Sequence, residues 1–263
     1  MSERDGYVSG VPCWIDTWQP DADAAVAFYT ELFGWQAEDT MPPDVPGKHF
    51  MCRVRGRDVA AIASRPQGAP AATAWGTYVW VESAEETAAR AVDAGGEVLI
   101  EPFDSLDGGR IAVVADPAGA AIGAWQPGVH KGAQLINEPG AWSMSQLSTP
   151  DPEGAKAFYG GVFGWTTESF GDEFTMWRLP GYVGGEPEQP VPRDVVAAMS
   201  AAEGQASWSV DFWTGDADAA AGTARRLGGS VLAGPFDTPV GRTAVLSDPA
   251  GAVFSVSKVV PAS

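Results

Sequence analysis

Apolar and polar positions along the first 65 residues predict one helix among several short strands. The stretch 14–18 is extended, and the helix that follows it is capped by an Asp and presents Ala25, Tyr29 and Leu32 on one face. Two more extended stretches follow, at residues 50–55 and 59–64. Together with the more complete second unit, they predict a β-α-β-β-β module.

A second unit of the same kind begins at residue 75. The stretch 75–81 is a strand, and 84–94 is a helix that ends at Gly95-Gly96, because glycine accepts the left-handed conformation of a helix C-terminus. The segment Asp116-Pro117-Ala118-Gly119 has the composition of a tight turn. Three further strands are predicted, at 98–103, 110–115 and 120–125.

The whole two-unit pattern occurs twice, at an offset of 130 to 133 residues. The repeated pairs are Phe28-Tyr29 with Phe158-Tyr159, Gly34-Trp35 with Gly164-Trp165, Trp75 with Trp208, Trp80 with Trp213, Gly95-Gly96 with Gly228-Gly229, and Asp116-Pro117-Ala118-Gly119 with Asp248-Pro249-Ala250-Gly251. Two copies with so long a period indicate two globular domains rather than a solenoid. We predict an α+β protein with domains at 8–127 and 139–260 and a linker at 128–138.

Charge and composition narrow the possible partners. The 263 residues carry a net charge of −18, which disfavours nucleic acid and anionic membrane surfaces. The polar start of the chain predicts no signal peptide, and no apolar run approaches the 18 residues of a membrane span. Cys13 and Cys52 are too few for a disulfide framework, so we expect a reducing, cytoplasmic setting.

These motifs resemble the vicinal oxygen chelate superfamily, which includes glyoxalase I, extradiol dioxygenases and bleomycin-resistance proteins. The resemblance rests on the Phe-Tyr and Phe-Gly-Trp motifs and on Gly-Gly, Pro-Phe and Asp-Pro-Ala-Gly in order, twice. It implies that each pair of β-α-β-β-β modules forms a half-open barrel with a cleft. The segment 176–182 further resembles a two-domain actinobacterial glyoxalase-like subgroup, whose members accompany aromatic polyketide antibiotic pathways.

Enzymes of this superfamily bind a divalent metal through His, Gln or Glu on the first strand of a module and Glu on its last strand. The corresponding first-strand positions here are Trp14, Gly76, Met144 and Ser209, and the last-strand positions are Gly123 and Ser255. None of these residues is a strong metal ligand. We therefore predict no metal and no cofactor. We expect His130 to lie in a solvated loop, whereas His49 opens a strand that could border a cleft.

Every second residue of a strand faces the same side, so aromatic residues take the place of ligands on the cleft face. The predicted ligand-binding residues are Trp14, Trp18, Tyr78, Trp80, Met144, Gln146, Trp177, Tyr182 and Trp213. Asp16 and Asp211 lie on the same faces and are the candidate catalytic residues, since apolar walls raise a carboxyl pKa. Tyr182 belongs to a Pro-Gly-rich segment, 180–192, that could close over the second cleft. Trp35 and Trp165 are predicted core residues.

Three functions fit these features. The first is metal-independent binding of a planar aromatic small molecule, for resistance or biosynthesis, with the acidic chain attracting a cationic ligand. The second is a metal-independent lyase, isomerase or hydroxylation-assisting enzyme that acts on an aromatic polyketide, with Asp16, Asp211 or Tyr78 moving protons. The third, and least supported, is a metal-dependent enzyme of the lactoylglutathione-lyase type.

Overall fold

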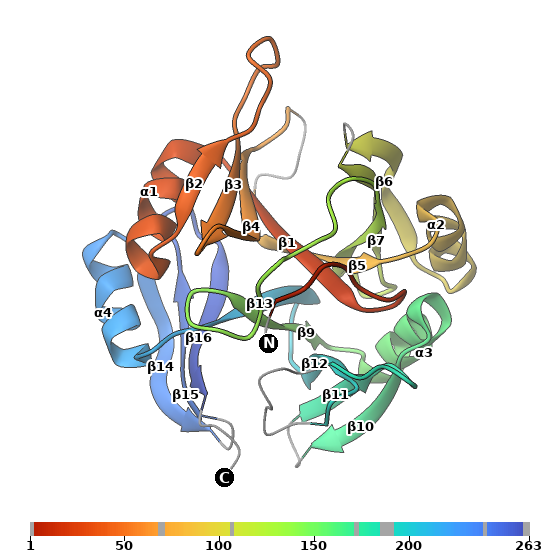
Figure 1. The fold of residues 1–263 in the computed structure, drawn as a ribbon. Coiled ribbons are helices and arrows are strands. Elements are labelled where there is room, and N and C mark those ends of the chain that lie inside the picture. The colour runs from red at the N-terminus through yellow and green to blue at the C-terminus, as the bar shows by residue number, and fades with distance from the viewer. Residues whose placement is uncertain are drawn as a thin grey trace.

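A computed structural model describes residues 3–67, 72–105, 108–170, 174–184, 192–238 and 241–259. It contains the predicted β-α-β-β-β order four times (Figure 1). The first module is β1 (Pro12–Gln19), α1 (Ala22–Phe33), β2 (Gln36–Asp39), β3 (His49–Val54) and β4 (Arg57–Ser64), and the second is β5 (Trp75–Trp80), α2 (Ala84–Asp93), β6 (Glu97–Ser105), β7 (Gly109–Ala115) and β8 (Ala121–Pro127). The third is β9 (Trp142–Thr149), α3 (Pro152–Phe163), β10 (Thr166–Phe170), β11 (Phe174–Arg178) and β12 (Val195–Ala201), and the fourth is β13 (Ser207–Trp213), α4 (Ala217–Arg226), β14 (Ser230–Thr238), β15 (Gly241–Ser247) and β16 (Val253–Val259).

Each pair of consecutive modules forms one eight-stranded sheet. The strand orders are β2-β3-β4-β1-β5-β8-β7-β6 and β10-β11-β12-β9-β13-β16-β15-β14. The antiparallel pairs β1–β5 and β9–β13 join the two modules of each sheet. Neither sheet closes into a barrel, so the predicted tandem α+β architecture is confirmed, and module one shares its sheet with module two. The domain bounds 8–127 and 139–260 stay predictions.

The repeated Phe-Gly-Trp motif ends a helix in both domains. Asp21 begins α1 by accepting a hydrogen bond from the Ala24 amide, and Gly34 ends it in the left-handed conformation at φ 72°. Asp151 and Gly164 do the same for α3. Each glycine turns the chain so that the tryptophan after it enters the core.

The repeated tyrosine and the repeated Asp-Pro-Ala-Gly turn meet across the domain boundary. The Tyr29 hydroxyl donates to Asp248 Oδ2 at 3.0 Å, and the Tyr159 hydroxyl donates to Asp116 Oδ2 at 3.1 Å. Each tyrosine oxygen also accepts a hydrogen bond from a tryptophan Nε1, at 2.9 Å from Trp75 and 2.8 Å from Trp208. The two domains are therefore joined by the same contact made twice in opposite directions.

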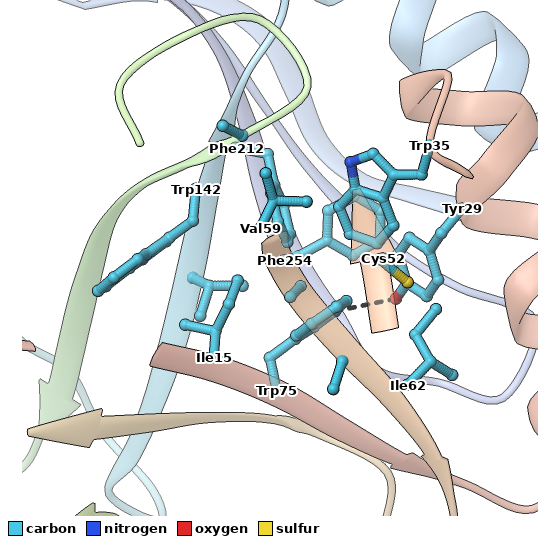
Figure 2. Close-up of a cluster of buried hydrophobic side chains, with 14 of the residues drawn as sticks. Ile15, Tyr29, Trp35, Cys52, Val59, Ile62, Trp75, Trp142, Phe212 and Phe254 are labelled. Carbon is cyan, nitrogen blue, oxygen red and sulfur yellow. Dashed lines mark hydrogen bonds between the residues drawn. The ribbon is translucent and has the colours of Figure 1, made fainter. Parts of the chain in front are cut away.

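The hydrophobic core crosses the same boundary. One cluster is built mainly from the first and fourth modules, and the other mainly from the second and third. Figure 2 shows Tyr29, Trp35 and Trp75 of the first domain against Phe212 and Phe254 of the second. In Figure 1, α1 lies beside α4 and α2 beside α3, in agreement with their contacts. The helical layers thus pack between the sheets of the two domains.

The tryptophans at the helix ends complete this interface. Trp35 Nε1 donates to the Gly140 carbonyl and Trp165 Nε1 to the Gly10 carbonyl, each at 2.6 Å. Both indoles are buried, so their prediction as core residues is confirmed. A side chain on Gly96 would overlap the Phe158 ring, which explains why the helix-ending glycines occur in pairs.

Removing the cross-domain hydroxyls should destabilise the protein. We expect Tyr29→Phe and Tyr159→Phe each to lower the free energy of unfolding by about 1–3 kcal/mol, because each leaves buried polar partners without a hydrogen bond. Urea denaturation measures this, with Val129→Ala, at an exposed side chain, as the control that changes little. Unchanged midpoints in both tyrosine variants would contradict the role assigned to these hydrogen bonds.

Candidate functional site

The first domain places its predicted site residues on the sheet face opposite the helices, which we call the inner face. Ile15 points to the helical core, so by strand alternation Trp14, Asp16 and Trp18 point to the inner face. Strand pairing sets Tyr78 beside Trp14, and Gly123 lies beside Tyr78 on its other flank. The structure therefore brings together residues from three strands.

Asp16 and Tyr78 form the chemical centre of this face. The Tyr78 hydroxyl donates to Asp16 Oδ2 at 3.0 Å. Burial raises the pKa of Asp16 to about 7, although the polar hydrogens of Tyr78 and Trp18 favour its charged form. A Cβ on Gly76 would lie 3.0 Å from Asp16 Oδ1, so this glycine gives the carboxyl group its room. The result is a carboxyl group that can change protonation near neutral pH.

Gly123 on β8 stands at the position where enzymes of the resembled superfamily have a metal-binding glutamate. A Cβ on Gly123 would overlap the Tyr78 ring, so a glutamate there is incompatible with this ring position. Within the described ranges, no group of three or more His, Cys, Asp or Glu side chains could hold a metal ion. The side chains of the inner face therefore do not fit the divalent metal that the fold family implies.

The linker covers part of the inner face. The His130 ring packs edge-on against Trp14 with centroids 4.4 Å apart, and it lies 5.4 Å from Trp125. The prediction of a solvated loop for His130 is wrong, and burial lowers the pKa of this histidine. Trp14 and Tyr78 are each only 5% exposed, whereas Trp18 and Trp80 are half-buried. Trp18 is thus the more accessible aromatic wall beside Asp16.

The second domain carries its acid on a different strand. Asp211 lies at the repeat position of Tyr78, while Gln146 takes the position of Asp16 and pairs with Ser209. The Asp211 carboxylate accepts hydrogen bonds from Ser143 and Ser257, each at 2.7 Å. Burial raises its pKa to about 6.

Other predicted residues of the second inner face are less enclosed by aromatic rings. Met144 pairs with Asp211, and Gln146 Nε2 donates to Ser200 Oγ at 3.0 Å. Trp213 is half-buried at the repeat position of Trp80. Because serines already satisfy both carboxylate oxygens of Asp211, this acid is less available to a ligand than Asp16.

The prediction that Trp177 binds a ligand is wrong. Its side chain has no exposed surface, and its ring lies 5.4 Å from Tyr159, underneath α3. It points away from the inner face because its place in the alternation of β11 is the core side. Trp177 is a core residue and leaves the set of ligand-binding candidates.

Trp80 and Tyr182 meet in a cleft between the domains that the repeat pattern did not reveal. This cleft has a volume of about 830 Å³. Its walls include Arg4, Tyr7, Trp80, Lys131 and Tyr182. Residues 185–191 of the segment proposed to close over the second cleft lie outside the described residues. Arg4, Tyr7 and Lys131 were missed, since nothing in the repeat distinguishes the residues before β1 or in the linker.

The sequence matches two related families of proteins, one in each domain. Residues 14–123 match the Glyoxalase/Bleomycin resistance protein/Dioxygenase superfamily, and residues 144–257 match the Glyoxalase-like domain. The chain therefore belongs to this glyoxalase-like superfamily, as the resemblance predicted. In the described part of the chain, no helix is long and apolar enough to cross a membrane.

Two proteins of similar sequence and one of similar structure belong with this chain in the comparison. CFP32 of Mycobacterium bovis, provisionally named a glyoxylase, is 41% identical over 269 residues, which cover 99% of both chains. The anthracycline biosynthesis protein DnrV of Streptomyces peucetius is 36% identical over 268 residues, covering 95% of this chain and 94% of its own. The Mn(II)-bound glyoxalase from Novosphingobium aromaticivorans shares the fold, with a TM-score of 0.64 and 15% identity over 95% of this chain and 82% of its own.

The close approach of Gly123 to Tyr78 gives a direct test of the site geometry. We expect Gly123→Ala to lower the free energy of unfolding by about 1–3 kcal/mol, because the new methyl group overlaps the ring. In a Tyr78→Ala background the same substitution should cost much less, and a double-mutant cycle by urea denaturation measures the difference.

A matched control is Gly222→Ala. This glycine lies in α4 with open space around it, so alanine should leave stability unchanged or raise it. Equal costs of Gly123→Ala in the two backgrounds would mean that Tyr78 does not occupy the space above Gly123.

Proposed function

We propose that this protein binds a planar, largely apolar aromatic small molecule on the inner face of the first domain, without a metal ion or other cofactor. The observation that carries the proposal is the hydrogen-bonded Asp16–Tyr78 pair beside Trp18, on the sheet face where the fold family implies a chelating site. A flat ligand would lie against Trp18, and its polar edge would meet Asp16. Ring contacts of this kind add about 0.5–1.5 kcal/mol to the gain from burial.

The names of two similar proteins support an aromatic compound as the ligand. DnrV of Streptomyces peucetius and DauV of a Streptomyces strain are named for anthracycline biosynthesis. Anthracyclines are polycyclic aromatic compounds, so an aromatic wall suits them. We infer a role in the biosynthesis of, or resistance to, such a compound. The net charge of −18 would favour a ligand that carries a cationic group.

The energetic scale is sufficient for useful affinity. Burying roughly 300 Å² of apolar ligand surface contributes about 7 kcal/mol at about 25 cal/mol per Å². Association costs reduce this figure, and micromolar affinity is attainable from what remains. We place the binding in the cytoplasm, where the two buried thiols, Cys13 and Cys52, would stay reduced.

A second candidate function is proton transfer on an aromatic substrate. A general base works best when its pKa lies near the working pH, and burial sets the pKa of Asp16 at about 7. Asp16 would take a proton from an acidic ligand carbon and return it at another position, as a lyase or isomerase requires. Exchange of such a proton for deuterium in D₂O, abolished in Asp16→Asn, would favour this function over binding alone.

Ligand binding tests the main proposal. We expect 1-hydroxyanthraquinone, a neutral planar tricycle, to quench tryptophan fluorescence, and Trp18→Ala to weaken its binding at least tenfold while the melting temperature stays close to that of the parent. Phe236→Ala, at an exposed aromatic side chain of the second domain, is the control and should bind like the parent. Equal affinities of the parent and Trp18→Ala would remove the aromatic wall from the site.

Stability should depend on pH through Asp16. Its carboxyl group has a pKa of about 7 in the folded protein and an ordinary value near 3.9 when unfolded. The folded state therefore binds the extra proton, so this stabilisation is complete below about pH 4 and is lost as pH rises through 7. Asp16→Asn should gain stability relative to the parent between pH 4 and 8, as thermal denaturation would show. A constant difference across that range would contradict the raised pKa.

A further inference from the structure

Arg4 is fixed at the junction of the two domains. Its backbone amide donates to the Gln134 carbonyl at 2.9 Å, next to a β-bridge between Glu3 and Leu135. The N-terminal segment is thereby held against the linker. The Nε and Nη2 atoms of Arg4 are buried and have no hydrogen-bond partner among the described residues. These two atoms form the edge of the guanidinium group that binds a carboxylate with two parallel hydrogen bonds.

Other arginines of this acidic chain behave differently. Arg53, Arg110, Arg178 and Arg242 each contact two carboxylate side chains. With 34 acidic residues available, an arginine with buried, unpaired nitrogens is unexpected. Among the described residues, no carboxylate contacts these two nitrogens.

Two further unsatisfied polar groups lie around the same small cavity. The cavity has a volume of about 60 Å³, and its walls include Arg4, Asn137 and Trp142. Asn137 Oδ1 and Trp142 Nε1 are buried and lack partners within the described ranges, and both residues are 4% exposed. Buried polar atoms are normally satisfied, so these atoms indicate a bound group that is polar. Arginine and indole N–H groups donate to a carboxylate, and the asparagine oxygen accepts from a hydroxyl or a water.

The small cavity adjoins the large cleft between the domains. Arg4, Tyr7 and Tyr182 line both spaces, and Trp80 and Lys131 line the cleft alone. At about 830 Å³ the cleft is within the range of small-molecule sites. Its aromatic side chains suit a flat ring, and Lys131 adds a second positive charge. Asp5 also lines the cleft and has an exposed side chain.

We propose that this junction is a second ligand site, which takes an aromatic carboxylic acid. The ring lies in the cleft against Trp80, Tyr7 and Tyr182, and the carboxylate receives hydrogen bonds from Arg4 at the small cavity. This site does not rest on the function proposed for the inner face. The volume of the small cavity suits a single carboxylate better than a larger anion.

Calorimetric titration with naphthalene-2-carboxylate tests the site. We expect saturable binding to the parent protein, and binding at least tenfold weaker in Arg4→Met and in Tyr182→Ala. The uncharged naphthalene-2-carboxamide should bind the parent at least tenfold more weakly than the acid. Arg226→Met removes the same charge from an exposed arginine on α4 and should leave binding unchanged.

Thermal denaturation separates a ligand site from a structural role. If Arg4 serves a ligand, Arg4→Met should melt at the same temperature as the parent or higher, since it removes two buried nitrogens that have no partner among the described residues. The acid should raise the melting temperature of the parent but not of the variant. The proposal is overturned if Arg4→Met binds the acid as tightly as the parent, if the amide binds as well as the acid, or if the acid does not bind the parent.

The binding proposals for the inner face and for the domain junction are tested independently of each other. Trp18→Ala should weaken binding of 1-hydroxyanthraquinone and leave binding of naphthalene-2-carboxylate unchanged, whereas Arg4→Met should do the reverse. Loss of both ligands in Arg4→Met would contradict two separate sites.

Discussion

The rest of the structure depends on the reciprocal contact between Tyr29 and Asp248 and between Tyr159 and Asp116. Each hydroxyl joins a helix of one domain to a turn of the other, within a core of buried aromatic rings. The helix-bearing faces of both sheets form this interface. The inner faces, on the opposite side of each sheet, are therefore directed away from it. The same packing brings the N-terminal segment and the linker together at the junction, where Arg4 lies.

A duplicated interface also allows the two inner faces to differ. The repeated residues that hold the domains together are the ones that the two copies keep in common. On the inner faces the copies differ: Asp16 faces Tyr78 in one, and Asp211 is satisfied by two serines in the other. Trp18 lies two residues from Asp16 as Trp213 does from Asp211, but burial raises the pKa of Asp16 to about 7, and its carboxylate has one hydrogen-bonded tyrosine rather than two serines. This asymmetry is the reason to place ligand binding in the first domain.

The sequence predicted the modules, the turns and the buried Trp35 and Trp165, since these follow from local periodicity and repetition. It missed β2, an exposed edge strand of four mainly polar residues with no apolar alternation. It also misplaced Trp177, because a β-strand pattern does not say which face is the core. The packing of His130 on Trp14 and the position of Arg4 depend on contacts between segments far apart in the chain, which no local pattern encodes. Asp16 and Tyr78 were each predicted on a cleft face, but their hydrogen bond depends on the register of β1 and β5.

Asp16 and Arg4 share one physical property that separates them from the other charged residues of the chain. The Asp16 carboxyl group and two nitrogens of the Arg4 guanidinium group are removed from water at a cost in free energy, and neither residue is paired with a side chain of opposite charge within the described residues. A fold selected only for stability would replace both or pair them, as it pairs Arg53 with Glu38 and Asp58. Departures of this kind are expected where a protein binds or transforms another molecule. Because the carboxyl group lies on an inner face and the guanidinium group at the domain junction, the two groups support two separate binding proposals.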